Sequence, residues 1–408
     1  MRRIILTKIK DKNGEDALFD AVVNVKKDSV NDIEKIAITA TEEKEIGSIY
    51  AVRVRDCVPN INACFVEYLP GKNAFLPMPK DFTPVFLNPK QNDKICCGDI
   101  ILVQKMKAKV KSKEAFVSTR IGSIGPAIFM QRGKFNVNFI GVLKEKKMYK
   151  KFRCDISQRL KQFENSGYAF VIRHSALNMT PEEIVAEAKK DIKETEALID
   201  EAKKRYARGE MKIPSCISEG QYLYKLWASQ YKDSLESVIT DSPELENEAR
   251  ELFSKFNMNV DVRLYNDKRY SLTNLYGLDK CLETALSRKV YLKSGGYLVF
   301  DYTEAMTVID VNSGKQIGGR DKERVVFELN KEAALEIIKQ VFFRNLSGII
   351  IVDFIGMEDP KHKEELISFI KERTESAPLL LKCHDFTKLG LMEITRQKIG
   401  RPIYEILS

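Results

Sequence analysis

The stretch Tyr297–Lys315, which reads YLVFDYTEAMTVIDVNSGK, decides the fold of the C-terminal part of this chain. Its apolar residues indicate two β-strands, Tyr297–Tyr302 and Ala305–Asn312, that are joined by a tight turn. A second stretch, Gly348–Met357 (GIIIVDFIGM), is short, β-branched and almost entirely apolar, which is typical of a buried strand. The pattern predicts that these strands are neighbours in one sheet.

Each apolar run ends in a carboxylate, Asp310 in the first and Asp353 in the second. Because side chains alternate along a strand, Asp310 and Asn312 are expected on the same face. A carboxylate at the end of a buried strand needs a compensating charge, and magnesium usually takes only one or two protein carboxylates. The pair therefore indicates a magnesium site, with Asn312 orienting Asp310 or a water. The alternative is that both carboxylates cap strand ends by accepting hydrogen bonds from backbone amides.

Two segments, SGGYLVFDYTEAMTVIDVNSGK and GIIIVDFIGM, closely resemble the catalytic signature of the ribonuclease E/G family. The resemblance extends from about Gly47 to Gln397. The two Asp and one Asn of the family fall on Asp310, Asn312 and Asp353. The resemblance implies an endoribonuclease in which both Asp hold Mg²⁺, water cleaves single-stranded RNA, and 5′-phosphate and 3′-hydroxyl ends remain. It also implies roles in rRNA processing and mRNA decay.

Composition describes a soluble globular chain of several domains, with 408 residues, 44% hydrophobic and 31% charged. The net charge of +9 fits a polyanionic partner. No apolar run reaches the ~18 residues of a membrane span, and we expect a cytoplasmic protein. The eight cysteines form no framework, so we expect reduced and mostly buried thiols.

Residues 46–121 carry five short strands separated by turn residues, which favours a small OB-fold barrel. The stretch GSIYAVRVRDCVPNINACFVEYLPGKNAFLP resembles the OB-fold RNA-binding domain of the same family. The resemblance places base-stacking aromatic residues at Phe65 and Phe75. Stacking tolerates any base because every base has a π-face. The alternative for both rings is packing in the core of the barrel.

Five lysines alternate with other residues in one predicted strand of this barrel. Strict alternation places all five ammonium groups on one face, roughly 6.7 Å apart, which is close to the phosphate repeat of an extended single strand. The alternative is a solvated edge strand that lysines protect from aggregation. Of the five, Lys113 matches an RNA contact of the family. The lysines are Lys105, Lys107, Lys109, Lys111 and Lys113.

Residues 122–213 are expected to hold a 5′-phosphate sensor and a long helix that Thr180 begins with a capping box. The segment GYAFVIRHS resembles the phosphate pocket of the family, where Arg173 matches an Arg and Gly125 lies near a glycine. The family has a Thr where this chain has His174, although imidazole can also donate to phosphate. The alternative for Arg173 is an ion pair with a carboxylate.

The resemblance implies an α+β multidomain fold. In it, residues 1–45 and 214–280 form a discontinuous ribonuclease H-like structural domain, and residues 281–408 form a DNase I-like α/β catalytic domain. The family does not cleave with the ribonuclease H-like domain. Its acidic residues Asp20, Asp233 and Asp241 are nevertheless the natural alternative active site.

The segment LMEITRQKIGRPIYEILS stands where larger relatives continue into a C-P-x-C zinc link and a small dimerisation domain. We therefore expect no zinc and none of the family's dimer elements, and the oligomeric state is left open. The predicted function is a magnesium-dependent endoribonuclease acting on single-stranded RNA. An RNA-binding or scaffold protein with little catalysis is the alternative, and a DNA nuclease using the same site is a third possibility.

Overall fold

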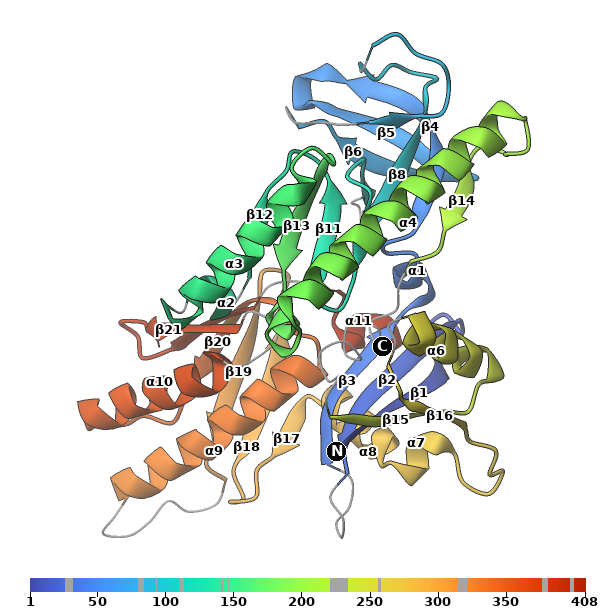
Figure 1. The fold of residues 1–408 in the computed structure, drawn as a ribbon. Helices are drawn as coiled ribbons and strands as arrows, with labels where there is room; N and C mark the ends of the chain where they lie inside the picture. The colour runs from blue at the N-terminus through green and yellow to red at the C-terminus, as the bar shows by residue number, and fades with distance from the viewer. Residues whose placement is uncertain are drawn as a thin grey trace. The chain divides into compact units, whose positions relative to one another are not determined.

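The computed structural model of the chain divides into two units, one formed by Met1–Ile38 with Ser234–Ser408 and the other by Thr39–Asp233 (Figure 1). The residues that the structure describes are 1–25, 32–79, 84–92, 94–109, 114–140, 142–145, 147–220, 234–255, 258–314, 322–375, 381–396 and 400–408.

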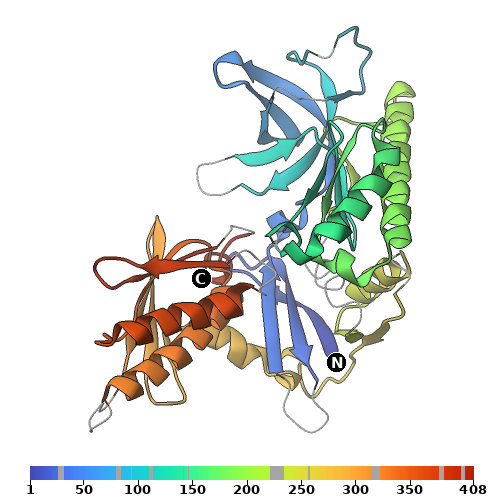
Figure 2. The same cartoon turned by 60° about the vertical axis from the view of Figure 1, so that its left-hand side comes forward.

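A six-stranded sheet forms the C-terminal part of the first unit, in the order β17-β18-β19-β20-β22-β21. Two long helices, α9 (Lys322–Phe343) and α10 (Pro360–Glu375), lie against one face of this sheet, as Figures 1 and 2 show. The strands are β17 (Lys289–Tyr291), β18 (Tyr297–Tyr302), β19 (Met306–Asn312), β20 (Gly348–Asp353), β21 (Leu381–Phe386) and β22 (Met392–Arg396).

Alternation along the strands separates the two faces of this sheet. Residues such as Phe300, Ile309 and Val352 point to the helices and belong to one hydrophobic core. The other face is open, and Ile349 on β20 keeps 46% of its surface exposed. The prediction that the apolar run of β20 is a buried strand is therefore right for one face only.

The second sheet of this unit joins the N-terminal strands to strands far along the chain, in the order β16-β15-β1-β2-β3. Strand β1 pairs in parallel with β15, so that Arg2 lies opposite Leu235. Strand β3 (Asp32–Thr39) forms one edge of this sheet, beside β2. The other elements are β1 (Arg2–Lys10), β2 (Asp16–Asn24), β15 (Leu235–Thr240), β16 (Asp261–Leu264), α6 (Pro243–Lys255), α7 (Leu272–Leu275), α8 (Leu278–Leu286) and α11 (Ile403–Leu407).

A closed five-stranded β-barrel of OB-like topology opens the second unit, which confirms the barrel that the sequence predicted. Its strands run in the order β4-β5-β6-β9-β8, and a β4–β8 pairing closes it. The β6–β9 pairing is parallel, whereas the other pairings of the barrel are antiparallel. The strands are β4 (Ile49–Val58), β5 (Ala63–Leu69), β6 (Lys72–Pro77), β8 (Ile100–Lys107) and β9 (Ala115–Ser118), with β7 (Val85–Phe86) and β14 (Ser215–Ser218) added.

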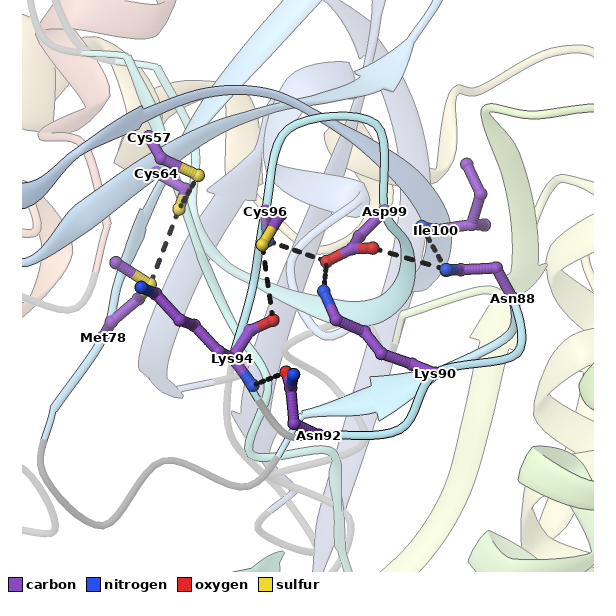
Figure 3. A network of polar contacts seen from close by, with 10 residues as sticks. All are labelled: Cys57, Cys64, Met78, Asn88, Lys90, Asn92, Lys94, Cys96, Asp99 and Ile100. Atoms are coloured by element: carbon purple, nitrogen blue, oxygen red, sulfur yellow. Dashed lines mark hydrogen bonds and ion pairs between the residues drawn. The ribbon is translucent and has the colours of Figure 1, made fainter.

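The loop before β8 is held by the buried carboxylate of Asp99 (Figure 3). Asp99 accepts a hydrogen bond from the Cys96 amide at 2.7 Å and forms an ion pair with Lys90. Nearby, the sulfur atoms of Cys57 and Cys64 lie 3.0 Å apart across strands β4 and β5. All eight cysteines are free, but only Cys64 and Cys383 are buried, so the prediction of mostly buried thiols is wrong.

A four-stranded sheet and several helices complete the second unit, with the strands in the order β10-β11-β13-β12. The capping box at Thr180 is confirmed, because its side chain and that of Glu183 exchange hydrogen bonds with each other's backbone amides. None of the helices in the described ranges combines the length and apolar character that a membrane crossing requires. The elements are α1 (Thr41–Lys44), β10 (Gly122–Ile124), β11 (Ile128–Arg132), β12 (Val137–Phe139), α2 (Val142–Glu145), α3 (Lys150–Leu160), β13 (Tyr168–Ile172) and α4 (Pro181–Ala207).

One buried guanidinium ties α9 to the six-stranded sheet. Arg344, at the end of α9, is 0% exposed, and its guanidinium carbon lies 3.8 Å from the centre of the Phe300 ring. A buried charge is tolerated only when its donors are satisfied. The guanidinium donates hydrogen bonds to Gln340 Oε1 (2.9 Å), Tyr302 OH (2.7 Å), Thr284 O (3.0 Å) and Ser287 O (2.7 Å).

Replacing Arg344 with Met is expected to lower the free energy of unfolding by about 3 kcal/mol, because buried carbonyls lose their donors. Urea unfolding followed by circular dichroism measures this change. The matched control is Arg324→Met, which alters an exposed arginine of the same helix and is expected to change stability by less than about 0.5 kcal/mol. Equal stability of both variants would contradict the stabilising role of the Arg344 guanidinium.

Candidate active site

Two carboxylates lie side by side on the open face of the six-stranded sheet. Strands β19 and β20 pair in parallel, and Asp310 is the register partner of Asp353. Register partners on neighbouring strands point to the same face, and neighbouring strands lie about 4.8 Å apart. Both side chains are exposed. The prediction that the two carboxylates come together from adjacent strands is confirmed.

Asn312 fixes one of these carboxylates. Its Nδ2 donates a hydrogen bond of 2.6 Å to Oδ2 of Asp310, which lies two residues earlier on β19. Within the described part of the chain, no backbone amide donates to Asp310 or Asp353. The strand-cap alternative therefore finds no support there, and the amide–carboxylate contact is the one that the sequence suggested.

The oxygen ligands at this site fit a hard divalent cation that takes few of its ligands from the protein. Asp310 and Asp353 are exposed anionic oxygen ligands, and Mg²⁺ commonly uses one or two carboxylates together with water and substrate oxygens. In the ranges that the structure describes, no group of three or more His, Cys, Asp or Glu side chains is arranged to hold a metal ion. A cation bound here would therefore rely on water and substrate for its remaining ligands.

Another acidic residue that the sequence did not indicate, Glu393, lies on the open face near Asp353. Glu393 on β22 is the register partner of Ile351, which lies two residues before Asp353 on β20. Its side chain is exposed and lies diagonally across from Asp353. The alternation of Met392–Arg396 contained the signal, since Met392 and Ile394 are buried while Glu393 between them is not.

The acidic residues of the five-stranded sheet do not form a comparable pair. Asp20 on β2 is the register partner of Leu6, whereas the next residue on β1, Thr7, donates a 2.8 Å hydrogen bond to Asp241. Asp20 and Asp241 therefore lie on opposite faces of the sheet. Asp20 is 0% exposed, and burial raises its pKa well above the usual range. Asp233 lies outside the described residues.

Three phenylalanines line the outside of the barrel on neighbouring strands. Phe65 pairs with Phe75, and Phe75 pairs with Phe116, with ring centres 5.8 Å and 6.2 Å apart. All three rings are half-buried, so they are not part of the sealed core. The Lys107 ammonium lies 5.6 Å from the centre of the Phe116 ring. The sequence indicated Phe65 and Phe75 as ring positions, whereas Phe116 becomes evident only in the structure.

The prediction that five alternating lysines share one face is wrong. Lys105 is 1% exposed, forms an ion pair with Glu45, and lies 3.3 Å from the hydroxyl of Tyr68. The cause is a register shift between Lys105 and Lys107 in the β8–β9 pairing, which breaks the alternation. Lys107 and Lys109 are exposed, and Lys109 pairs with Glu114 at 3.0 Å. Lys111 and Lys113 lie outside the described residues.

The predicted phosphate pocket contains a carboxylate that the sequence analysis did not identify. Arg173 donates a 2.8 Å hydrogen bond to the carbonyl of Gly125, and His174 beside it is exposed. Glu187 of α4 accepts hydrogen bonds from the Ala127 and Ile128 amides. A β-carbon on Gly125 would lie 2.1 Å from a Glu187 oxygen, so a side chain there would displace the Glu187 carboxylate.

The Glu187 carboxyl and the Arg173 guanidinium perturb each other's pKa in this pocket. Burial raises the pKa of Glu187 to about 7, although the two amides and Arg173 oppose this shift. Burial also lowers the pKa of Arg173, and the Glu187 carboxylate partly offsets that effect. An anion that binds Arg173 would therefore compete with Glu187 in its ionised form.

The raised pKa of Glu187 predicts a pH-dependent loss of stability. The group binds its proton more tightly in the folded state, so its stabilising effect is complete below pH 4.5 and is lost as pH rises through about 7. A shift of this size corresponds to about 3 kcal/mol. The free energy of unfolding of Glu187→Gln, relative to that of wild type, is expected to rise progressively from pH 5 to pH 8.

Urea unfolding at a series of pH values measures this difference. Glu201→Gln, at an exposed position of the same helix, is the matched control, and its difference from wild type should not vary with pH. A difference for Glu187→Gln that is equally flat would show that the carboxyl titrates normally.

The chain is similar to one known protein family and to several of its members. Residues 137–399 match the ribonuclease E/G family. The chain is 27% identical to ribonuclease G of Haemophilus influenzae over 380 residues, which cover 89% of the chain and 74% of that protein. It is 26% identical to the putative ribonuclease E of Buchnera aphidicola over 420 residues, covering 100% of the chain and 97% of that protein.

The longer relatives extend well beyond the matched region. The chain is 24% identical to ribonuclease E of Escherichia coli over 375 residues, and the match covers 89% of the chain but 34% of that protein. For ribonuclease E of Haemophilus influenzae the match covers 39% of the relative.

Proposed function

Because this chain belongs to the ribonuclease E/G family, we propose that it is a magnesium-dependent endoribonuclease that cleaves single-stranded RNA. The observation that carries the proposal is the register pairing of Asp310 with Asp353 beside Asn312 on an open sheet face. The matched region, residues 137–399, includes all three residues. Cleavage leaves 5′-phosphate and 3′-hydroxyl ends, and the protein acts in the processing and decay of RNA.

In this proposal Asp310 and Asp353 hold Mg²⁺, and Asn312 keeps the Asp310 carboxylate in one orientation through its 2.6 Å hydrogen bond. A bound magnesium ion supplies an acidified water and stabilises negative charge on the phosphate. The protein side chains contribute fixed negative charge on a face that is open to a strand of RNA. Orientation matters because a carboxylate held in place needs no reorganisation when the ion and the phosphate arrive.

The barrel is proposed to bind the RNA strand, with Phe65, Phe75 and Phe116 stacking bases and Lys107 contacting the backbone. Lys109, Lys111 and Lys113 remain proposed contacts as well, whereas the burial of Lys105 removes it from this set. Aromatic rings on neighbouring strands suit successive unstacked bases.

Gly125, Arg173 and His174 are proposed to recognise a 5′-monophosphate. A guanidinium binds phosphate through paired hydrogen bonds. In this structure the Arg173 guanidinium donates a hydrogen bond to the Gly125 carbonyl. Recognition would strengthen when Glu187 is protonated, because the competing carboxylate charge is then absent.

The domain assignment is also part of the proposal. We assign residues 1–45 with 214–280 to a ribonuclease H-like structural domain and residues 46–121 to the RNA-binding barrel. Residues 122–213 form the sensor region with its long helix, and residues 281–408 form a DNase I-like catalytic domain.

Removing either catalytic charge is expected to abolish cleavage without loss of RNA binding. Asp310→Asn and Asp353→Asn should each lower kcat at least about 100-fold, because a neutral amide holds a divalent cation poorly. A fluorescent 5′-monophosphate oligonucleotide, incubated with Mg²⁺ or EDTA, measures cleavage, and fluorescence anisotropy measures binding.

The matched control is Asp301→Asn, which removes an exposed carboxylate from the same face but one that pairs with Arg288. It should cleave at the wild-type rate. Turnover that survives in both active-site variants would refute the metal-site assignment. Binding by the wild-type protein with no Mg²⁺-dependent cleavage would instead identify an RNA-binding or scaffold protein, and equal cleavage of a DNA oligonucleotide would identify a general nuclease.

The proposed contacts of the barrel with RNA are of two kinds, base stacking by aromatic rings and electrostatic attraction by lysines. Phe75→Ala, at the centre of the aromatic row, should weaken RNA binding about tenfold and leave its salt dependence unchanged. Lys107→Gln should instead reduce the slope of log Kd against log salt concentration by about 0.7, because one fewer counterion is released.

Anisotropy titrations at four salt concentrations distinguish these effects. Lys12→Gln removes an exposed lysine from a turn between β1 and β2 and serves as the control for general charge. If it reduced the slope as much as Lys107→Gln does, the barrel lysine would have no special role.

A further inference from the structure

An aromatic pair stands on the open face of the six-stranded sheet, directly beside the candidate active site. Tyr297 on β18 is the register partner of Asn312 on β19, and Tyr291 on β17 is the register partner of Tyr297. One row of side chains across three strands therefore runs from Tyr291 through Tyr297 to Asn312. Asn312 in turn holds the Asp310 carboxylate.

A lysine organises the two rings. The Lys289 ammonium lies 3.5 Å from the centre of the Tyr297 ring and 4.9 Å from the centre of the Tyr291 ring. The ring centres are 6.1 Å apart, with their planes inclined by 56°. Tyr291 keeps 71% of its surface exposed, so most of its ring is open to solvent. A cation over aromatic faces favours one ring orientation, which reduces the entropy lost when a flat ligand binds.

The backbone holds this hairpin close to the catalytic strand. A β-carbon added to Gly296, just before Tyr297, would lie 2.8 Å from the Asn312 carbonyl oxygen. A side chain there would push the β17–β18 hairpin away from β19. The glycine thus permits a close approach that fixes the tyrosines beside Asn312.

The surroundings of the rings suit the face of a nucleobase. Val299, Val308 and Ile351 lie on the same open face in a half-buried state, and they form an apolar floor between the charged residues. The alternative is that the cross-strand tyrosine pair serves only to stabilise the hairpin. That role requires neither an ammonium over both rings nor a position beside Asn312. Flat apolar surface, a cation and neighbouring carboxylates together match a nucleotide whose phosphate lies near a metal site.

We propose that Tyr291, supported by Tyr297 and Lys289, is a stacking site for one base of the RNA strand, one or two nucleotides from the phosphodiester that is cleaved. The inference rests on the proposed function, because it takes the scissile phosphate to lie at Asp310 and Asp353. Lys289 contributes a positive charge to the phosphate of the stacked nucleotide. Stacking accepts every base, and purines bind more tightly because they present a larger π-face.

The site predicts where the strand is cut. A base held on Tyr291 fixes the register of the RNA relative to the carboxylates, so that cleavage occurs at a constant distance from a purine. Without the ring, the strand slides, and cleavage should spread over neighbouring phosphodiesters.

The direct test is a set of RNA oligonucleotides that carry 2-aminopurine at successive positions around the cleavage point. Stacking on tyrosine quenches the fluorescence of this base. In the Asp310→Asn background, which leaves the RNA intact, we expect quenching at one position within two nucleotides of the cut. That quenching should disappear when Tyr291→Ala is added.

Cleavage by otherwise wild-type protein gives the second readout. Tyr291→Ala should raise KM about tenfold and broaden the cut positions, with kcat changed less than threefold. Tyr270→Ala, at a tyrosine that is 64% exposed in the five-stranded-sheet part of the chain, is the matched control and should behave as wild type.

The outcomes separate this inference from the function on which it rests. Normal Mg²⁺-dependent cleavage with unchanged KM and unchanged quenching in Tyr291→Ala would overturn the stacking site and leave the endoribonuclease in place. Tyr291-dependent quenching in a protein that does not cleave would support the stacking site and refute the catalytic proposal.

Discussion

The parallel pairing of β19 with β20 is the constraint on which the candidate site depends. This register makes Asp310 and Asp353 direct neighbours, although 42 residues separate them along the chain. A shift of one residue in either strand would turn one carboxylate into the hydrophobic core beneath the sheet. The core residues Ile309 and Val352, each adjacent to one carboxylate, therefore specify the site as much as the acids do, because their burial selects the register.

One face of that sheet packs in the hydrophobic core, and the other face carries the candidate site. Helices α9 and α10 cover one face with apolar side chains, and the buried Arg344 links α9 to β18 through its hydrogen bond to Tyr302. The other face is left to charged, aromatic and half-buried apolar residues. A sheet that is rigid on one side can present a fixed pattern of ligands on the other, which is what a preorganised site requires.

Period-two alternation at strand ends made the candidate site residues readable from the sequence. Strand β18 was predicted with the bounds that it has, and Asp310, Asn312 and Asp353 fall on one open face as expected. The predictions that were wrong or incomplete have local structural causes. A bulge in β8 turned Lys105 inward, and no sequence pattern signals a bulge there. Glu187 and Phe116 become neighbours of their sites only through tertiary packing, so spacing alone could not identify them.

The pairing of β1 with β15 has a consequence for how the chain is made. The hydrogen bond between Arg2 and Ser234 joins residues 232 positions apart, so the first strand leaves the ribosome long before its partner exists. At a translation rate of about 5–20 residues per second, the delay is roughly 10–50 s. During that time the edge of β1 that pairs with β15 has no partner strand. Nascent chains of this protein should therefore depend on chaperones until the second half of the sheet emerges.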